Sequence, residues 1–447
     1  MYPLYSALLA LALVVSLPYW LVQWARHGKY RAGLRQRLGQ VPSRLTAKEA
    51  GPVIWVHAVS VGEVLAVAGL VRELKRAFRL YRVVVSTTTA TGQQLAQSRF
   101  GEDNVFYFPL DFAFAIEPYL RRLQPELVVV AETEFWPNFL RLAHASGARI
   151  AVVNARISDR SFPRYCRWRL ILSRVLRPVD AFLAQTEEDR RRLLAIGASP
   201  DRVQVSGNLK FDVTMPDPPP IVASLRAAFQ QAQAQPVMVC GSTVEGEEKL
   251  LLDAFAKVRE KFPRAMLILA PRHPERFADV AQLLENSAIP FWRRSAWSGE
   301  PLSGGVLLLD SIGELASLYA LADLALVGGS LVPRGGHNIL EPAKYGVPIL
   351  VGPYTENFRD IIRVFQANHA VRVVQPDELS VALTDLASNE ADRKSLGRLA
   401  AETLRSHTGA TRRTTAALAQ LLETRPSEIA LESPLSERGG GLVTPPK

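Results

Sequence analysis

Acidic residues follow two apolar runs that have the composition of β-strands. Glu63 comes after the run at 53–57 and a glycine-containing turn, where the first turn of a helix is expected. Glu132 and Glu134 stand two residues apart after a second, wholly apolar run. A carboxylate at such a strand end can accept a proton from an attacking hydroxyl group, whereas an unpaired buried charge is costly to a core. We therefore predict Glu63 as a general base and Glu132 as a second functional acid.

The alternative for Glu63 and Glu134 is that each is an ordinary acidic residue at the start of a helix. Acids are common in the first turn of a helix because they complement the helix dipole. Pro137 suits a first helical turn just after Glu134. The relative roles of Glu132 and Glu134 stay open from the sequence.

Two basic residues occupy positions in the sequence similar to those of the acidic residues. Lys210 lies in the stretch 206–212, just before a proline-rich segment, and Arg272 follows a further apolar run. A guanidinium group can donate to a phosphate or a carboxylate in bidentate fashion. The alternatives are a solvated lysine and a helix cap with a surface arginine.

A glycine-rich connection supplies the last group of candidates. Gly328, Gly329 and Ser330 follow an apolar run, and the stretch 333–342 then enters a helix. Backbone N–H groups at such a turn, with a helix behind them, form an anion site. Glu341 could hold ribose hydroxyls. The pattern is neither a dinucleotide fingerprint nor a P-loop, and a plain glycine-rich connection is the alternative.

The elements that must position these residues alternate between short apolar runs and amphipathic stretches. Runs that are apolar on both faces and alternate with helices predict parallel sheets covered on both sides, with ligands at the carboxyl ends of the strands. The fold class is therefore α/β, with two Rossmann-like doubly wound domains. The predicted strands are 53–57, 82–86, 104–108, 127–131, 150–153 and 181–184 in the first half, and 237–240, 266–270, 306–309, 324–327 and 348–351 in the second.

Domain boundaries follow from composition. We predict a first domain at 49–214, a stiff proline-rich linker at 215–225 and a second domain at 226–424. The tail at 425–447 is rich in Pro, Gly and Ser and is predicted to be disordered.

The amino terminus has the pattern of a membrane anchor. Residues 2–25 carry no charge, and a bilayer-spanning helix needs about 20 residues. Tyr19, Trp20 and Trp24 suit the membrane interface, and the basic segment 26–48 that follows predicts a cytoplasmic location for the rest of the chain. An anchor that lies in the interface is the alternative to one that spans.

The net charge of +10 is concentrated in two segments. Residues 1–48 hold seven basic residues and no acid, and residues 156–177 hold seven arginines and one acid, so the rest of the chain sums to −3. The second segment mixes its arginines, Arg164 and Arg167 among them, with aromatic and aliphatic residues. This pattern indicates contact with a lipid and its phosphates more than with nucleic acid, for which the chain has no motif. A solvated helix with an ordinary core face is the alternative.

Five ordered motifs together resemble the 3-deoxy-D-manno-octulosonic acid (Kdo) transferases of Gram-negative bacteria. The resemblance extends from the apolar amino terminus to about residue 422. The motifs are Ser60-Val-Gly62-Glu63, Glu132-Thr-Glu134-Phe-Trp136-Pro137-Asn138, Gly207-Asn208-Leu209-Lys210, Pro271-Arg272-His273-Pro274-Glu275-Arg276 and Gly335-Gly336-His337-Asn338-Ile339-Leu340-Glu341-Pro342.

The resemblance implies a GT-B glycosyltransferase with an amino-terminal acceptor domain and a carboxyl-terminal donor domain. Its reaction would transfer Kdo from CMP-Kdo to lipid IVA, the lipid A precursor, at the cytoplasmic face of the inner membrane, and it would invert the sugar's configuration. Glu63 matches the proposed base, and Glu132 and Lys210 match positions that stabilise the transition state. The positions matching CMP-binding segments are Pro271, Arg272, Ile312, Gly313, Glu314, Asn338, Ile339, Leu340 and Glu341. We assign acceptor binding to Ser60, Gly62, Glu134, Arg164 and Arg167.

The chemistry of the residues agrees with this expectation. A sugar-transfer transition state resembles an oxocarbenium ion, and a carboxylate base assists the attack. Arg272 and the helix start after Gly335 would neutralise the leaving phosphate. Because no Asp-x-Asp pair occurs near the donor motifs, we expect no cofactor and no metal.

Two other classes remain alternatives: an enzyme like the nucleotide-sugar 2-epimerases, and a membrane-tethered protein that binds a nucleotide sugar without catalysis. The sequence leaves open the number of Kdo residues added and the oligomeric state.

Overall fold

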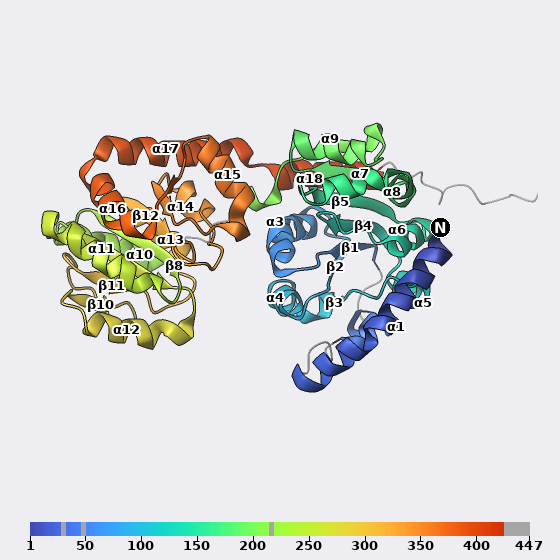
Figure 1. Ribbon diagram of the computed structural model, residues 1–447, viewed down its shortest axis with the longest axis horizontal. Coiled ribbons are helices and arrows are strands. Elements are labelled where there is room, and N and C mark those ends of the chain that lie inside the picture. The colour runs from blue at the N-terminus through green and yellow to red at the C-terminus, as the bar shows by residue number, and fades with distance from the viewer. Residues whose placement is uncertain (28–32, 46–50, 214–218, 424–447) are drawn as a thin grey trace, which may run out of the picture. The chain divides into compact units, whose positions relative to one another are not determined.

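The computed structural model describes residues 1–27, 33–45, 51–213 and 219–423 (Figure 1). The chain divides into two compact units. Unit 1 comprises Met1–Gly207 and the chain from Thr411, and unit 2 comprises Asn208–Ala410. Lys29, Arg31 and Lys48 of the predicted basic segment, most of the proline run and the predicted tail lie outside the described residues.

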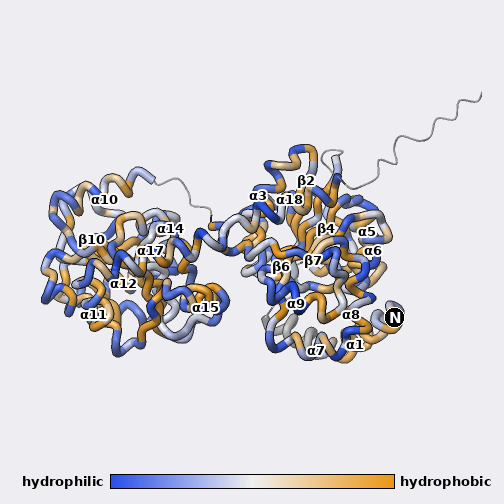
Figure 2. Tube along the Cα trace, turned by 90° about the horizontal axis from the view of Figure 1, so that it is seen from above, coloured by the Kyte–Doolittle hydropathy of each residue, from blue (hydrophilic) through white to orange (hydrophobic). Residues whose placement is uncertain are grey.

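Unit 1 is built on a parallel sheet of seven strands in the order β3-β2-β1-β4-β5-β6-β7. Trp55 of β1 lies in its core and packs edge-on against Phe139 with ring centroids 4.9 Å apart. The strands of a parallel sheet like this one are buried on both faces, which explains why their residues are apolar along the length of each strand (Figure 2). The strands are β1 Val53–His57, β2 Arg82–Thr87, β3 Val105–Tyr107, β4 Pro125–Ala131, β5 Arg149–Ala155, β6 Ala181–Ala184 and β7 Val203–Val205.

Helices cover both faces of this sheet: α3 and α4 lie on one face, and α5 and α6 lie on the other (Figure 1). The last helix, α18, returns to unit 1, where the Arg413 side chain donates to the carbonyl of Ser206 at 2.8 Å. The helices are α1 Tyr2–His27, α2 Leu34–Arg37, α3 Val61–Ala77, α4 Ala90–Phe100, α5 Ala113–Leu123, α6 Pro137–Ala145, α7 Phe162–Arg167, α8 Arg169–Leu176, α9 Glu187–Ala195 and α18 Ala410–Glu423.

Unit 2 repeats the plan with a second parallel sheet of seven strands, in the order β10-β11-β9-β8-β12-β13-β14. The strands are β8 Val237–Thr243, β9 Met266–Pro271, β10 Phe291–Arg293, β11 Val306–Leu308, β12 Leu324–Val327, β13 Ile349–Val351 and β14 Arg372–Val373. The helices are α10 Pro220–Gln231, α11 Glu247–Lys261, α12 Phe277–Glu285, α13 Leu315–Leu318, α14 Leu340–Lys344, α15 Arg359–Ala367, α16 Leu379–Ser388 and α17 Glu390–His407. The predicted α/β class with two Rossmann-like domains is confirmed.

The chain passes from unit 1 to unit 2 earlier than the proline-rich segment suggested. The crossing follows Gly207, and residues 208–213 already belong to unit 2. The side chain of Phe211 is buried there beside Val327 and Ile339, so the core of unit 2 already includes a residue that precedes the proline-rich segment.

Helix α1 covers the predicted anchor at 2–25, but the prediction of a membrane-spanning helix is not supported. Among the helices of the described residues, none combines the length and the apolar character needed to cross a membrane. The inner face of α1 carries hydroxyl groups that contact unit 1. The Tyr2 hydroxyl donates to the carbonyl of Arg174 in α8 at 3.5 Å, and the Ser6 hydroxyl accepts from Asn138 at 3.0 Å. The amino-terminal end of α1 accordingly lies beside α8 (Figure 1).

Candidate active site

The strand order of unit 1 reverses between β1 and β4, which are neighbours in the sheet. Ligands of doubly wound sheets bind beside the carboxyl ends of the strands at such a switch point. Glu63 follows β1 and Glu132 follows β4, so the two predicted acids lie on the two sides of the switch point. The topology therefore brings together residues that are far apart in the sequence.

Glu63 is a buried carboxyl group in the first turn of α3. One oxygen accepts from the backbone N–H of Val59 at 2.8 Å, and the other accepts from the hydroxyl of Ser60 at 3.0 Å. Burial raises the pKa of Glu63 to about 7; the Val59 N–H opposes this rise, while the charges of Glu132 and Glu134 add to it. Glu63 thus lies in the first turn of α3, where an acid complements the helix dipole, and the same environment holds its pKa where a general base works best near neutral pH.

Glu132 has the backbone conformation of a constrained site. Its φ is 56°, in the left-handed region that costs a non-glycine residue energy, and its N–H donates to the Val153 carbonyl at 2.9 Å. The adjacent strand repeats this feature at Asn154, whose φ is 54°. Sequence reasoning missed Asn154, which no motif distinguishes.

Glu134 completes an acidic cluster with Glu63 and Glu132. Burial and the charge of Glu132 both raise the pKa of Glu134. Ser60 contacts this acidic cluster through the hydrogen bond that its hydroxyl donates to Glu63. A methyl group added at Gly62 would meet only the Ser60 hydroxyl, at 3.9 Å, so packing does not require glycine there.

Lys210 belongs to unit 2, whereas the acidic cluster belongs to unit 1. It lies in a single 3-10 turn, Leu209–Phe211, whose other two side chains are buried. The side chain of Asn208 caps this turn by accepting from the Lys210 N–H at 3.0 Å. The predicted catalytic residues therefore come from both units.

In unit 2, Arg272 follows β9, Asn338 precedes α14 and Glu341 lies in the first turn of α14. The Arg272 charge opposes the rise that burial causes in the pKa of Glu341. Burial and, to a smaller extent, the charges of Arg272 and His273 lower the pKa of His337 to about 4, which favours the neutral imidazole near neutral pH. Its Nε2 atom is buried and has no hydrogen-bond partner within the described residues. Asn338 donates to Glu341 at 3.3 Å. Arg272, His337, Asn338 and Glu341 thus form one polar cluster.

An internal carboxylate fills the glycine-rich turn after β12, which was predicted to form part of an anion site. Glu247, fully buried at the start of α11, accepts from the N–H of Gly329 at 2.7 Å, of Ser330 at 3.0 Å and of Leu331 at 2.8 Å. A further bond comes from Val244 at 3.0 Å. The turn does bind an anion, as its backbone predicts, but the anion is the protein's own side chain, and these amides are not free for a substrate phosphate.

The rest of the predicted donor segment divides into exposed and buried residues. Ile312 is 78% exposed beside Gly313, while Glu314 forms an ion pair with Arg294 at 2.9 Å. Ile339 and Leu340 are buried, so any contact with a ligand would come from their backbone. Helix α14 has only five residues, which leaves it little dipole of its own. Pro271 is the buried last residue of β9.

Arg164 and Arg167 project from α7 on the outer surface of unit 1. Phe162 and Tyr165, on the other side of this helix, pack against the core. The outward side continues into exposed apolar residues, Trp168, Leu170 and Ile171. One face of this stretch therefore packs on the core and the other is basic and apolar, and contact of the exposed face with lipid stays a prediction.

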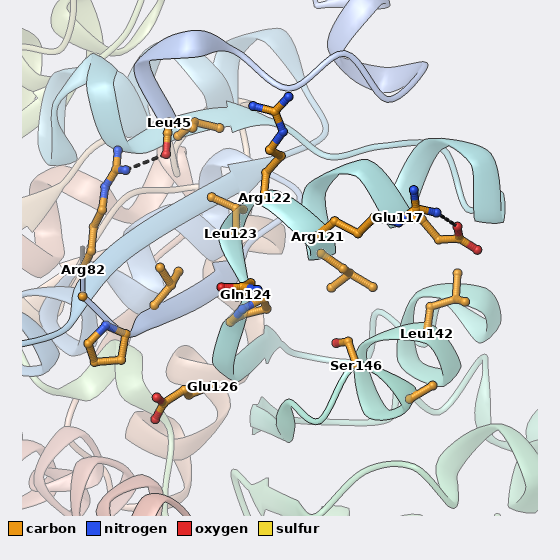
Figure 3. Close-up of a pocket in the computed structure, with 16 residues that line it drawn as sticks. Leu45, Arg82, Glu117, Arg121, Arg122, Leu123, Gln124, Glu126, Leu142 and Ser146 are labelled. Atoms are coloured by element: carbon orange, nitrogen blue, oxygen red, sulfur yellow. Dashed lines mark hydrogen bonds and ion pairs between the residues drawn. The ribbon is translucent and has the colours of Figure 1, made fainter. Parts of the chain in front are cut away.

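A pocket lies elsewhere, at the amino ends of β1, β2 and β4 (Figure 3). It has a volume of about 1040 Å³. Arg82 donates to the Leu45 carbonyl at 2.7 Å, and Arg121 forms an ion pair with Glu117 (Figure 3). Two of the basic residues that line the pocket therefore already have partners within the protein. Because Leu45 and Gly51 line it and residues 46–50 lie outside the described residues, its volume indicates no ligand site.

Comparison with known proteins decides the family. Residues 32–213 match the family described as 3-deoxy-D-manno-octulosonic-acid transferase (kdotransferase). The chain is 37% identical to the 3-deoxy-D-manno-octulosonic acid transferase of Bordetella pertussis over 417 residues, which cover 89% of this chain and 95% of the relative. It is 35% identical to that of Haemophilus influenzae over 390 residues, which cover 86% and 90% of the two chains. The chain belongs to the Kdo transferase family.

A solved structure shows the same fold. The crystal structure of MurG from Acinetobacter baumannii matches with a TM-score of 0.51 at 13% identity, over 83% of this chain and all of that one. At this identity the likeness concerns the fold alone. Membership of the Kdo transferase family makes the chain a glycosyltransferase, and it agrees with the placement of acids at the switch point of unit 1.

Proposed function

We propose that this chain transfers Kdo from CMP-Kdo to lipid IVA, with Glu63 as the general base. The observation that carries the proposal is the Glu63 carboxyl group, whose pKa burial raises to about 7 at the switch point of a Kdo transferase fold. The carboxylate takes the proton of the acceptor hydroxyl as the hydroxyl oxygen bonds to the anomeric carbon of Kdo. The bond between that carbon and the phosphate oxygen breaks, and CMP leaves with the electron pair.

The neighbouring acids serve the acceptor side. Glu132, held at a φ of 56°, stabilises the positive charge that develops on the sugar, and Glu134 binds acceptor hydroxyls. Ser60 keeps Glu63 oriented through its hydrogen bond of 3.0 Å. The resemblance to the family also assigns Lys210 to the transition state.

The donor side is assigned to unit 2. Arg272 has the chemistry to neutralise the CMP phosphate, and Glu341 and Asn338 can bind ribose hydroxyls. We propose that the transfer needs no metal ion, with these side chains supplying the electrostatic stabilisation. Full activity in the presence of a chelator is the expected result, and loss that added Mg²⁺ restores would contradict this point.

We further propose that unit 1 rests on the cytoplasmic face of the inner membrane. Leu4, Leu8 and Leu11 of α1 are exposed on the side away from unit 1. Exposed Trp168 and Leu170 follow the arginines of α7. An apolar stripe with a neighbouring basic surface suits a helix that lies in the lipid interface, where arginines bind lipid phosphates.

Mass spectrometry of lipid IVA incubated with CMP-Kdo and the purified chain tests the function. The expected result is a mass increase by one or more Kdo residues. No increase in the presence of detergent or lipid vesicles would contradict the proposal.

A further inference from the structure

Helix α1 is held on unit 1 by specific polar contacts on one face. The Tyr5 hydroxyl donates to the Asp111 carboxylate, and the Ser6 hydroxyl accepts from the side-chain amide of Asn138 at 3.0 Å. On the opposite face Leu4 and Leu8 are exposed. Apolar contact alone would let a helix rotate or slide, whereas paired hydroxyls fix its rotation and its register.

Asp111 in turn holds the start of α6. It is only 2% exposed, and its carboxylate accepts from the N–H of Phe139 at 2.7 Å and of Asn138 at 3.1 Å. The Asn138 side chain donates back to the Asp111 carbonyl at 2.6 Å. The first amides of a helix have no partner within the helix, so a buried carboxylate there fixes both their position and their direction.

The start of α6 is also the downstream end of the loop that carries Glu132 and Glu134. The upstream end is fixed where the Glu132 N–H donates to the Val153 carbonyl at 2.9 Å. Between the two ends the loop makes short internal bonds, from Phe135 to the Thr133 carbonyl at 3.0 Å for example. A left-handed residue such as Glu132 persists only where its surroundings over-determine it, so a loose α6 start would release the loop.

We propose that Asp111 is a positioning residue, and that α1, through Tyr5 and Ser6, holds Asp111 and the start of α6 so that the acidic loop is set for the acceptor. The inference rests on the proposed function, because it gives that loop a role in transfer. Burial raises the pKa of Asp111, and the amides of Asn138 and Phe139 and the Tyr5 hydroxyl oppose the rise. The Tyr5 hydroxyl of α1 therefore favours the charged carboxylate, against the larger effect of burial. The same helix that meets the lipid thus orders the acceptor loop.

The test compares Tyr5→Phe, Ser6→Ala and Asp111→Asn with wild type. Tyr81→Phe is the matched control, because the Tyr81 hydroxyl donates to the Glu126 carboxylate at 3.0 Å at the amino ends of β2 and β4, whereas the acidic loop follows the carboxyl end of β4. The measurements are kcat and KM with CMP-Kdo and lipid IVA, CMP affinity by calorimetry, and hydrogen exchange of peptides within 132–141. Tyr5→Phe and Asp111→Asn should each lower kcat about tenfold and speed exchange at Asn138 and Phe139. CMP affinity and the control should stay at wild-type values.

Two results would overturn the inference. One is wild-type exchange and wild-type kcat in both Tyr5→Phe and Asp111→Asn. The other is faster exchange with unchanged kcat, which would leave Asp111 a purely structural role. Should Asp111→Asn not fold, Tyr5→Phe decides, since it leaves both backbone amides bound to Asp111. Failure of wild type to transfer Kdo would refute the proposed function instead, and the exchange difference between Tyr5→Phe and Tyr81→Phe would still test the docking.

Discussion

Two buried carboxylates hold the two loops that matter most, and they do so with different partners. In unit 2, Glu247 accepts from four backbone amides, all within that unit, and is fully buried. In unit 1, Asp111 accepts from two backbone amides at the start of α6 and also from the side chain of Tyr5 in α1.

The difference shows how each loop depends on its surroundings. The bonds that hold the glycine-rich turn after β12 involve no residue of α1, so the geometry of this turn should be insensitive to lipid. The acidic loop before α6 depends on a helix whose other face is apolar and exposed. We expect changes around α1 to alter acceptor transfer, and changes around Glu247 to alter donor binding.

The largest expected effect comes from Glu63→Gln. Loss of the base should lower kcat by about 10²- to 10⁴-fold while CMP affinity stays unchanged. Glu73→Gln is the control, because Glu73 lies on the same helix in a surface pair with Arg76 at 2.6 Å. Steady-state rates and calorimetry give the two values. A kcat within threefold of wild type would remove Glu63 from the mechanism.

Glu247→Gln tests the unit 2 part of the comparison, the glycine-rich turn that Glu247 holds. An amide NH₂ would face backbone donors, which should lower the free energy of unfolding by about 3 kcal/mol and weaken CMP binding. Exposed Glu245 supplies the control variant, Glu245→Gln. Chemical denaturation and calorimetry are the measurements. Unchanged stability would mean that the glycine-rich turn does not need its internal anion.

The apolar stripe of α1 should matter to lipid and not to the donor. Leu8→Asp and Leu11→Asp together should weaken binding to anionic vesicles at least about tenfold. Each substitution removes an exposed apolar side chain that we expect to be buried in the lipid interface. Leu80→Asp, at a leucine that is 84% exposed in a turn of unit 1, is the control. Vesicle flotation measures the effect. Equal flotation of both variants would exclude α1 from the lipid contact.

A smaller effect is expected from the basic surface. Arg164→Gln and Arg167→Gln should each weaken vesicle binding about fivefold, the effect of roughly 1 kcal/mol per basic residue near an anionic surface. Arg99→Gln on α4, also exposed, is the control. The loss should shrink as salt is raised, and a loss that is independent of salt would contradict an electrostatic contact.

The fold could be predicted from the sequence where strands are buried on both faces. The predicted apolar runs became β1 to β6, β8, β9 and β11 to β13. The missed strands are β7, β10 and β14, all at sheet edges and partly exposed. An edge strand has no continuous apolar run, so its pattern does not differ from that of a loop.

The candidate site could be predicted where its residues lie close to their own strand end. Glu63 and Glu132 follow apolar runs, which made them visible. Glu247 and Asp111 act on amides 82–84 and 27–28 residues away along the chain, so no local pattern distinguishes them from ordinary polar residues. The contacts of α1 could not be predicted for the same reason, because hydrophobicity alone does not show that Tyr5 and Ser6 bind the rest of unit 1.

The dependence of kcat/KM on pH tests most directly whether Glu63 is the base. A base must be unprotonated, and burial raises the pKa of Glu63 to about 7. With saturating CMP-Kdo and lipid IVA as the varied substrate, kcat/KM should rise about tenfold per pH unit below that value and level off above it. A flat profile between about pH 5.5 and 8 would contradict the assignment of Glu63 as the base.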